Sequence, residues 1–267
     1  MYQTTYHRAS SLGDASAKMQ AAGDGKYVAG GMTLIPAMKL RLAAPSDLID
    51  LRDVAELKGI TVSGRNVTIG AGTTHFEVAT SQELMAVCPA LCQLASHIGD
   101  PHVRYMGTLG GSVANNDPAA DYPAAMLALN ATIRTDRREL PAEQFFTGLF
   151  ETALEDGEIV TAVSFTAPAK AGYAKFPNPA SRYAMTGVFV ARTDGGEVRV
   201  AVTGAGDNGV FRATQMESAL AGRFEPSALD GVSVPAGNMM SDIHASAEYR
   251  ANLVAVMAKR AVAAANA

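Results

Sequence analysis

The 267-residue chain predicts an α+β fold, in which helices and short strands alternate first and an antiparallel hairpin with helices closes the chain. Three observations predict it: capping signals ahead of helical stretches, short β-rich runs bounded by turn residues, and two glycine-rich loops where such elements join. The pattern of residue types changes near residues 166–172, and this change divides the chain into regions 1–167 and 168–267. The first region is expected to form two lobes, about 1–56 and 57–167.

The first lobe has the pattern of a small βαβ-like unit. Ser11 predicts the start of a helix that runs to Ala22, where the turn residues Gly23-Asp24-Gly25 end it. Tyr27-Val28 and Leu48–Leu51 are β-rich runs, so each is expected to be a short strand on either side of a connection.

The second lobe is predicted from alternating runs and a capping box. The expected elements are a strand at 67–69, a short helix opened by Thr74–Glu77, a helical stretch at 84–98 with a break near Pro89, and strands at 131–134 and 158–165. In the closing region, Asp194-Gly195-Gly196 separates two β-rich runs at 188–192 and 198–202, which is a strong hairpin signal. Helices are expected at 213–220 and 245–262.

Two glycine-rich loops predict a site for a phosphate-bearing ligand. Adjacent glycines let main-chain N–H groups approach a phosphate closely, and nearby hydroxyls add donors. The first loop consists of Ala29, Gly30, Gly31, Met32 and Thr33, and the second of Thr108, Leu109, Gly110, Gly111 and Ser112. Asp121 offers an acceptor for a hydroxyl of a ribose or a similar chain. Either loop alone could be a tight turn, but together they suggest a dinucleotide with two phosphates.

Side chains at the second loop are expected to interfere with that ligand. Valine in place of Gly110 or Gly111 should block the approach of the backbone to a phosphate while leaving the fold largely intact. A third stretch, Gly204–Gly209, matches the spacing GxGxxG, but the strand before it belongs to the predicted antiparallel hairpin and Phe211-Arg212 separates it from any helix. We therefore expect a plain connection there, not a Rossmann dinucleotide site.

Composition narrows the class of protein. The 22 Lys and Arg against 26 Asp and Glu give a net charge of −4, which offers no electrostatic reason to expect nucleic acid as a partner. No signal peptide or membrane-spanning stretch is recognisable, so we expect a soluble protein of the cytoplasm. Cys88 and Cys92 are the only cysteines, and the five histidines form no ligand grouping, so buried thiols and no metal site are expected.

The context of both loops resembles the two FAD-pyrophosphate motifs of the molybdenum hydroxylase flavoproteins. Met38-Lys39-Leu40-Arg41 follows the first loop, while Asp100–Arg104 precedes the second and Asp117-Pro118 through Asp121-Tyr122-Pro123 follows it. The chain is most similar to the FAD-binding medium subunit of aerobic carbon monoxide dehydrogenase and its relatives, a branch related to the flavin domain of xanthine dehydrogenase. The resemblance extends over nearly the whole chain.

This resemblance implies a fold and a set of cofactor contacts. Residues 1–167 would form a two-lobed FAD-binding domain of the vanillyl-alcohol-oxidase (PCMH) type, and residues 168–267 a small domain of antiparallel strands and helices. FAD would be bound non-covalently, with both glycine loops at its pyrophosphate and Asp121 at one of its hydroxyls. Ile159 or Val160 would line the adenine or flavin pocket, and Lys175 matches a family lysine near the flavin. No catalytic acid, base or nucleophile is assigned.

The implied function is electron transfer within a larger complex. FAD on this chain would pass electrons from [2Fe–2S] clusters of a small subunit, supplied by a molybdenum cofactor on a large subunit, to an acceptor such as quinone or NAD. The complex would lie in the cytoplasm or peripherally at the inner membrane. Two alternatives remain at this point: a stand-alone FAD-dependent reductase of the same fold superfamily, similar to UDP-N-acetylenolpyruvoylglucosamine reductase, and a flavin-free assembly or nucleotide-sensing module.

Overall fold

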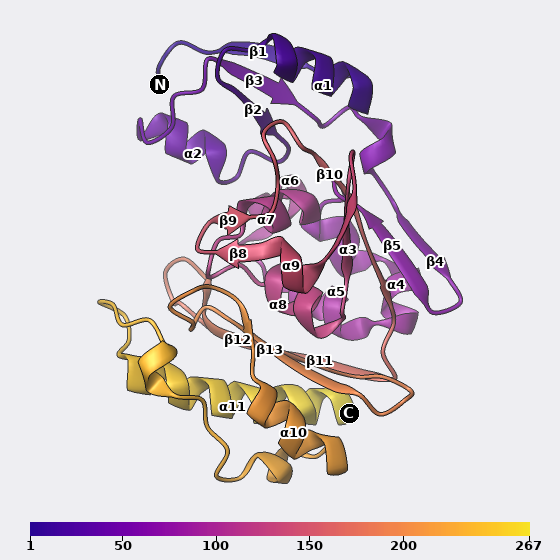
Figure 1. The fold of residues 1–267 in the computed structure, drawn as a ribbon, viewed down its shortest axis with the longest axis vertical. Coiled ribbons are helices and arrows are strands. Elements are labelled where there is room, and N and C mark those ends of the chain that lie inside the picture. Colours follow the sequence, from indigo (N-terminus) through magenta and orange to yellow (C-terminus); the bar gives the residue numbers. More distant parts are fainter.

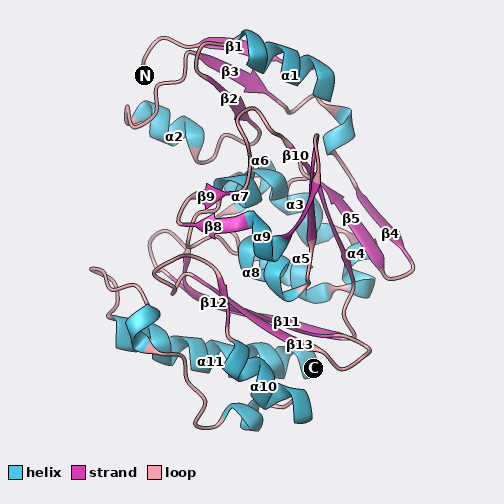
Figure 2. Ribbon diagram, viewed as in Figure 1, coloured by secondary structure: helices cyan, strands magenta, loops and turns pink.

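Three parts follow one another along the chain in the computed structural model, which describes residues 1–267. Figure 1 shows the N-terminal lobe at the top, a second lobe with most of the helices in the middle, and the C-terminal part at the bottom. Each part has its own sheet, of three, five and four strands respectively. Helices and mostly antiparallel sheets occupy separate layers (Figure 2), so the predicted α+β class is confirmed.

The N-terminal lobe is built around a three-stranded parallel sheet in the order β1-β3-β2. Its elements are β1 (Thr5–Arg8), α1 (Leu12–Ala21), β2 (Gly25–Val28), α2 (Leu34–Lys39) and β3 (Asp47–Asp50). The βαβ-like unit is confirmed, and Ser11 caps α1 by accepting a hydrogen bond from the Asp14 N–H. Strand β1 was not predicted because its side chains are mostly exposed and lack an apolar alternation; pairing with β3 makes it a strand.

The second lobe has a five-stranded antiparallel sheet in the order β4-β5-β10-β6-β7 and a layer of helices. Its elements are η1 (Ala55–Leu57), β4 (Ile60–Ser63), β5 (Asn66–Gly70), α3 (His75–Thr80), α4 (Gln82–Val87), α5 (Pro89–Ser96), α6 (Pro101–Met106), α7 (Leu109–Asn115), α8 (Tyr122–Ala128), β6 (Thr132–Thr135), β7 (Glu139–Pro141), α9 (Ala142–Phe145), β8 (Phe146–Gly148), β9 (Glu151–Thr152) and β10 (Val160–Thr166). The predicted break near Pro89 is confirmed, since this proline opens α5.

The C-terminal part is an antiparallel sheet in the order β11-β12-β13-β14 with helices packed on it. Its elements are β11 (Lys170–Pro177), β12 (Ala184–Arg192), β13 (Val198–Thr203), β14 (Phe211–Arg212), α10 (Thr214–Gly222), η2 (Pro226–Leu229), η3 (Ala236–Asn238) and α11 (Ala247–Asn266). The predicted hairpin is confirmed, with Val188 opposite Val202. Helices α10 and α11 contact one side of this sheet while α5 and α8 of the second lobe also pack on it (Figure 1).

The two β-rich parts share one core through this middle layer of helices. A cluster of 38 buried residues extends from the second lobe to Tyr173 and Phe189 of the C-terminal sheet. A separate cluster of 19 residues lies between that sheet and α11. Cys88 and Cys92 are buried free thiols within the larger cluster, as expected, and burial raises their pKa values to about 12 and about 11.

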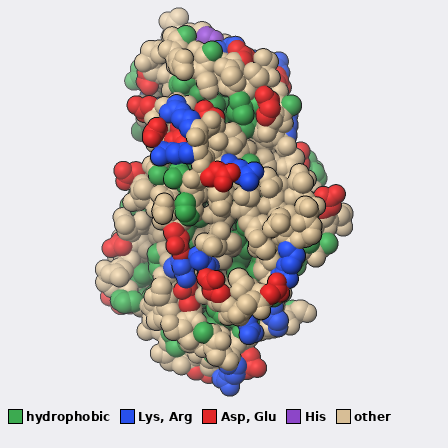
Figure 3. Space-filling model, turned by 45° about the vertical axis from the view of Figure 1, so that its right-hand side comes forward, with side chains coloured by type: hydrophobic (Ala, Val, Ile, Leu, Met, Phe, Trp, Pro, Cys, Tyr) green, Lys and Arg blue, Asp and Glu red, His purple; other side chains and the backbone are tan.

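Surface charges are paired rather than segregated. Glu143 of α9 accepts a hydrogen bond from Arg199 at 3.0 Å and another from Arg212, so it joins the second lobe to the C-terminal sheet. On the face drawn in Figure 3, acidic and basic side chains lie next to one another at several places. None of the helices is both long enough and apolar enough to cross a membrane.

Candidate functional site

A cleft of about 890 Å³ lies where the N-terminal lobe meets the second lobe. Both glycine-rich stretches line it, one from the connection between β2 and α2 and the other from the start of α7. Residues 158–160, at the start of β10, and residues 181–183, between β11 and β12, also contribute. The cleft therefore collects segments from all three parts of the chain, and its volume suits a large organic ligand.

The first glycine loop presents a row of free hydrogen-bond donors. It leaves the carboxyl end of β2, where the Leu51 N–H donates to the last strand carbonyl, that of Val28, at 2.9 Å. None of the N–H groups from Ala29 to Thr33 donates to an acceptor within the protein. Backbone N–H groups that are shielded from water are almost always paired, so the free N–H groups of the half-buried Ala29, Gly30 and Gly31 indicate a ligand with acceptor oxygens. Met32 and Thr33 are exposed and extend this row of donors.

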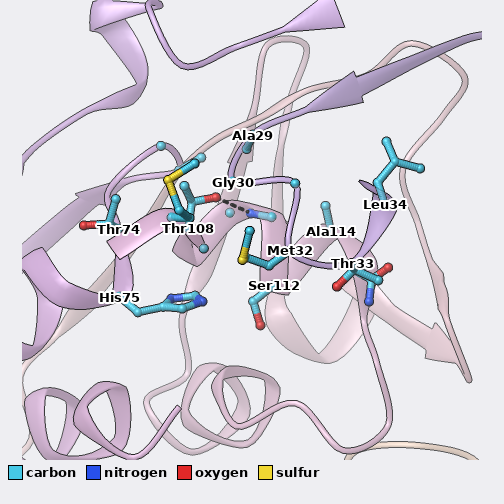
Figure 4. A pocket seen from close by; sticks show the side chains of 18 of the residues that line it. Ala29, Gly30, Met32, Thr33, Leu34, Thr74, His75, Thr108, Ser112 and Ala114 are labelled. Atoms are coloured by element: carbon cyan, nitrogen blue, oxygen red, sulfur yellow. Dashed lines mark hydrogen bonds between the residues drawn. The ribbon is translucent and has the colours of Figure 1, made fainter. Parts of the chain in front are cut away.

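Two glycines give this loop its shape for different reasons. A Cβ at Gly30 would lie closer than 3.0 Å to the backbone of Met106 and Gly107, so the first loop passes directly against the second glycine stretch. Gly31 has a φ of +71°, a left-handed conformation that side chains rarely adopt. Figure 4 shows Ala29, Gly30 and Met32 of this loop beside Thr108 and Ser112.

The second glycine stretch differs from the expected open loop, because helix α7 begins within it. Thr108 is the N-cap and accepts a hydrogen bond from the Gly111 N–H at 3.1 Å (Figure 4). The N–H groups of Leu109 and Gly110 donate to backbone carbonyls of Thr73 and Ala71. Most donors of this stretch are therefore used by the fold, and it offers the Thr108 N–H and the hydroxyls of Thr108 and Ser112 to the cleft.

The expectation that Gly110 tolerates valine without loss of the fold is wrong. A Cβ at Gly110 would lie closer than 3.0 Å to both the side chain and the backbone of Ala71, so this glycine is required by packing. Gly111 faces more space, since its Cβ would meet the Thr108 hydroxyl at 2.9 Å and only Ala29 beyond it, at 3.9 Å. Only Gly111 of the two therefore tests ligand binding.

Asp121 reaches the cleft, with an ionic network behind it. Its carboxylate accepts a hydrogen bond from the Tyr173 hydroxyl and lies 2.9 Å from the Lys175 ammonium. Both charged side chains are almost completely buried, and the Lys175 ammonium also donates to the His97 carbonyl at 3.2 Å. Burial raises the pKa of Asp121, while Lys175 opposes that shift. Lys175 itself does not line the cleft, so the structure places it behind Asp121.

The start of β10 and the residue before it contribute apolar side chains to the cleft. Ile159 and Val160 are both buried and line it. The preceding Glu158 is held by Arg138, whose guanidinium donates to both of its oxygens at 3.0 and 2.9 Å. These bonds lower the pKa of Glu158 to about 2. The ion pair therefore fixes the start of β10 in place beside the cleft.

Several residues of the cleft were missed by the sequence analysis. His75, at the start of α3, and Tyr183, between β11 and β12, line the cleft from segments far from either glycine loop. So do four cationic residues, Lys26, Arg52, Lys58 and Arg182, of which Arg52 is paired with Asp50. The capping box Thr74–Glu77 signalled the helix that begins at His75, but nothing in the local sequence indicated that its first residue faces a ligand site.

The arrangement fits a dinucleotide. Free N–H groups in the first loop, the hydroxyls of Thr108 and Ser112, and cationic side chains suit negatively charged phosphates, while apolar side chains such as Ile159 and Val160 suit a planar ring. No three His, Cys, Asp or Glu side chains come together in a way that could hold a metal ion. Gly204–Gly209 connects the antiparallel strands β13 and β14, as expected, and its residues 206–209 line a different, smaller cavity.

Comparisons with known proteins agree with this chemistry. A family model described as the FAD binding domain in molybdopterin dehydrogenase matches residues 2–168. The carbon monoxide dehydrogenase medium chain of Afipia carboxidovorans is 37% identical over 276 residues, covering 96% of this chain and 94% of that protein. The nicotine 6-hydroxylase medium subunit of Paenarthrobacter nicotinovorans is 33% identical over 270 residues, covering 96% and 95%.

The fold agrees as well. The structure of reconstituted carbon monoxide dehydrogenase from Oligotropha carboxidovorans matches with a TM-score of 0.89 and 35% identity, covering 99% of each chain. The similarity in sequence and in fold thus extends over nearly the full length of this chain and of these relatives. The chain therefore belongs to the family of FAD-binding medium subunits of molybdopterin dehydrogenases, as the resemblance of its two glycine motifs predicted.

Proposed function

We propose that this chain binds one FAD non-covalently and transfers electrons as the flavoprotein subunit of a molybdenum-containing hydroxylase or dehydrogenase. The observation that carries the proposal is the row of free N–H groups from Ala29 to Thr33, opposite the hydroxyls of Thr108 and Ser112. Donors in two facing loops suit the two phosphates of a dinucleotide. Residues 1–167 are the FAD-binding part of this proposal and residues 168–267 the smaller domain.

The remaining contacts follow from position in the cleft. Asp121 lines the cleft, and a carboxylate has about four acceptor sites, so bonds to Tyr173 and Lys175 leave room for a cofactor hydroxyl. In this proposal Lys175 positions Asp121 and does not touch the flavin. Ile159 and Val160 would pack against a ring of the cofactor.

The place of the chain in electron transfer rests on its family. Bound FAD can exchange electrons singly or in pairs, which suits a junction between one-electron centres and a two-electron acceptor. The two cysteines of this chain are buried and too few to ligate an iron–sulfur cluster. We infer that a small subunit with [2Fe–2S] clusters and a large subunit with the molybdenum cofactor supply the electrons, and that quinone or NAD accepts them. The cytoplasmic location stays a prediction.

Reconstitution tests the cofactor assignment. Apoprotein mixed with FAD and desalted should retain a flavin absorption spectrum, and acid should release the flavin because no covalent bond holds it. A folded apoprotein that does not bind saturating FAD would contradict the proposal.

Activity measurements test the subunit assignment. The isolated holoprotein should oxidise no organic substrate at a measurable rate, whereas co-expression with the small and large subunits should give a complex that reduces an artificial acceptor. A stand-alone reductase would instead turn over by itself at on the order of 1 to 1,000 per second. Slow NADH oxidation by the isolated chain is compatible with the proposal, since it is the acceptor reaction in reverse.

A further inference from the structure

His75 is a buried polar side chain at the cleft with nothing in the protein to bind. It is the first residue of α3, it is 5% exposed, and it lines the cleft beside the second glycine stretch. Its Nδ1 atom is buried and has no hydrogen-bond partner. In Figure 4 the imidazole extends from α3 towards the side of the cleft where Met32 and Ser112 lie.

The fold alone does not account for this imidazole. A buried polar group without a partner costs about 1–3 kcal/mol, and such groups are rare in folded proteins. An apolar side chain of similar size would fill the same space without that cost. The ring of Tyr122 lies nearby, at 5.4 Å between centroids, but its hydroxyl does not hydrogen-bond to His75 and is itself buried without a partner.

The charge state of His75 is defined by its surroundings. Burial, and to a lesser extent the positive charge of Arg104, lower the pKa of His75 to about 4. At neutral pH the ring is therefore uncharged and carries one N–H donor and one acceptor nitrogen. A neutral imidazole can donate to a ligand oxygen without bringing a further charge into the cleft.

The position of the ring limits which part of a ligand it can reach. An ideal Cβ at Gly107 would lie 2.6 Å from Nε2, so the imidazole touches the residue immediately before the helix cap Thr108. The first loop passes the same point, since a Cβ at Gly30 would collide with Met106 and Gly107. His75 thus lies where the two phosphate-type loops meet.

We propose that His75 is a cofactor-contacting residue whose neutral imidazole hydrogen-bonds an oxygen of the FAD segment between Met32 and Ser112, where the two loops meet. This inference rests on the proposed FAD site. It adds a donor outside both glycine motifs, supplied by α3. The polar group that is left unpaired in the protein becomes paired when the cofactor is bound.

Two substitutions of His75 test this contact in the full-length subunit. We expect His75→Leu to raise the FAD dissociation constant at least tenfold, because a hydrogen bond is lost, whereas His75→Gln keeps a donor and should stay within about threefold of wild type. The melting temperature of the His75→Leu apoprotein should equal or exceed that of wild type, because an unpaired buried polar group has been removed. His244→Leu, at an exposed histidine of the C-terminal part outside the cleft, is the control and should change neither quantity.

A second substitution, at Gly107, tests the position of the His75 imidazole. Gly107→Ala adds a Cβ against Nε2 and should weaken FAD binding in wild type, but it should add little in a His75→Ala background, where the ring is absent. If the effects of Gly107→Ala and His75→Ala on FAD affinity are additive, the proposal is overturned. Unchanged FAD affinity in His75→Leu would also overturn it. So would a His75→Leu apoprotein whose loss of stability is as large as its loss of FAD binding. If wild type itself fails to bind FAD, the proposed function fails; if only these variants behave unexpectedly, the role of His75 alone is lost.

Discussion

Replacing Gly31 with valine tests whether the conformation of the first glycine loop is needed for FAD binding, independently of the rest of the fold. Gly31 has a φ of +71°, and its Cβ would lie 2.9 Å from the Ile35 side chain. A β-branched residue at this φ either keeps the loop at a cost of about 1–3 kcal/mol or rotates the peptide out of its conformation. Rotation turns N–H groups of the loop away from the cleft.

The expected loss of FAD affinity follows from those donors. An N–H bond to a charged oxygen contributes about 1.5–3 kcal/mol, so losing two costs roughly 3–6 kcal/mol. Since about 1.4 kcal/mol corresponds to a factor of ten, the dissociation constant should rise at least about a hundredfold. The strain itself should lower the melting temperature by about 2–12 °C, at about 2–4 °C per kcal/mol for a chain of this size.

Gly64 supplies a matched control. It has a φ of +60° in the turn between β4 and β5, nothing lies within 4 Å of its ideal Cβ, and it does not line the cleft. Gly64→Val should therefore lose similar stability and keep wild-type FAD affinity. Fluorescence titration of both apoproteins with FAD, with thermal unfolding alongside, measures the two effects. The reasoning is refuted if Gly31→Val binds FAD within threefold of wild type, or if Gly64→Val loses as much affinity.

Two further predictions concern ion pairs beside the cleft. Lys175→Met leaves the buried Asp121 carboxylate without its cationic partner and should lower the free energy of unfolding, measured by urea titration, by about 3–5 kcal/mol. The control is Lys170→Met, at an exposed lysine, which should change the free energy of unfolding by no more than about 0.5 kcal/mol. Equal effects of the two substitutions would contradict the stabilising role of the buried pair. The pKa of Glu158 is lowered to about 2 in the folded state by Arg138, so its stabilising contribution is complete above pH 4.5 and is lost as the pH falls towards 2. Wild type should thus lose more stability than Glu158→Gln between pH 5 and pH 3, and parallel curves would refute this.

Local patterns were enough to predict the elements that form by short-range interactions. The capping signals at Ser11 and Thr74 and the proline at Pro89 begin helices in the structure, and the turn at Asp194–Gly196 joins the predicted hairpin. Each depends on hydrogen bonds or backbone restrictions within a few residues, which the sequence displays directly. The family resemblance was equally visible, since it depends on residue types and spacing in the two glycine motifs.

Distant pairing could not be predicted in the same way. Strand β1 exists because it pairs with β3, about 40 residues later, and it lacks the apolar alternation of a half-buried strand. The five-stranded sheet likewise places β10 between β5 and β6, an order that no local pattern contains. Partners across the chain decide these strands.

The sequence by itself therefore determined the class of fold, the two glycine motifs and the family. The tertiary structure decided what each glycine does: Gly110 is glycine because Ala71 lies against it, and the free donors belong to the first loop because the second is already the start of a helix. It also brought His75 to the cleft and placed Lys175 behind Asp121. The physical reason is that motifs record residue types along the chain, whereas burial, unpaired donors and close contacts arise only when distant segments pack together.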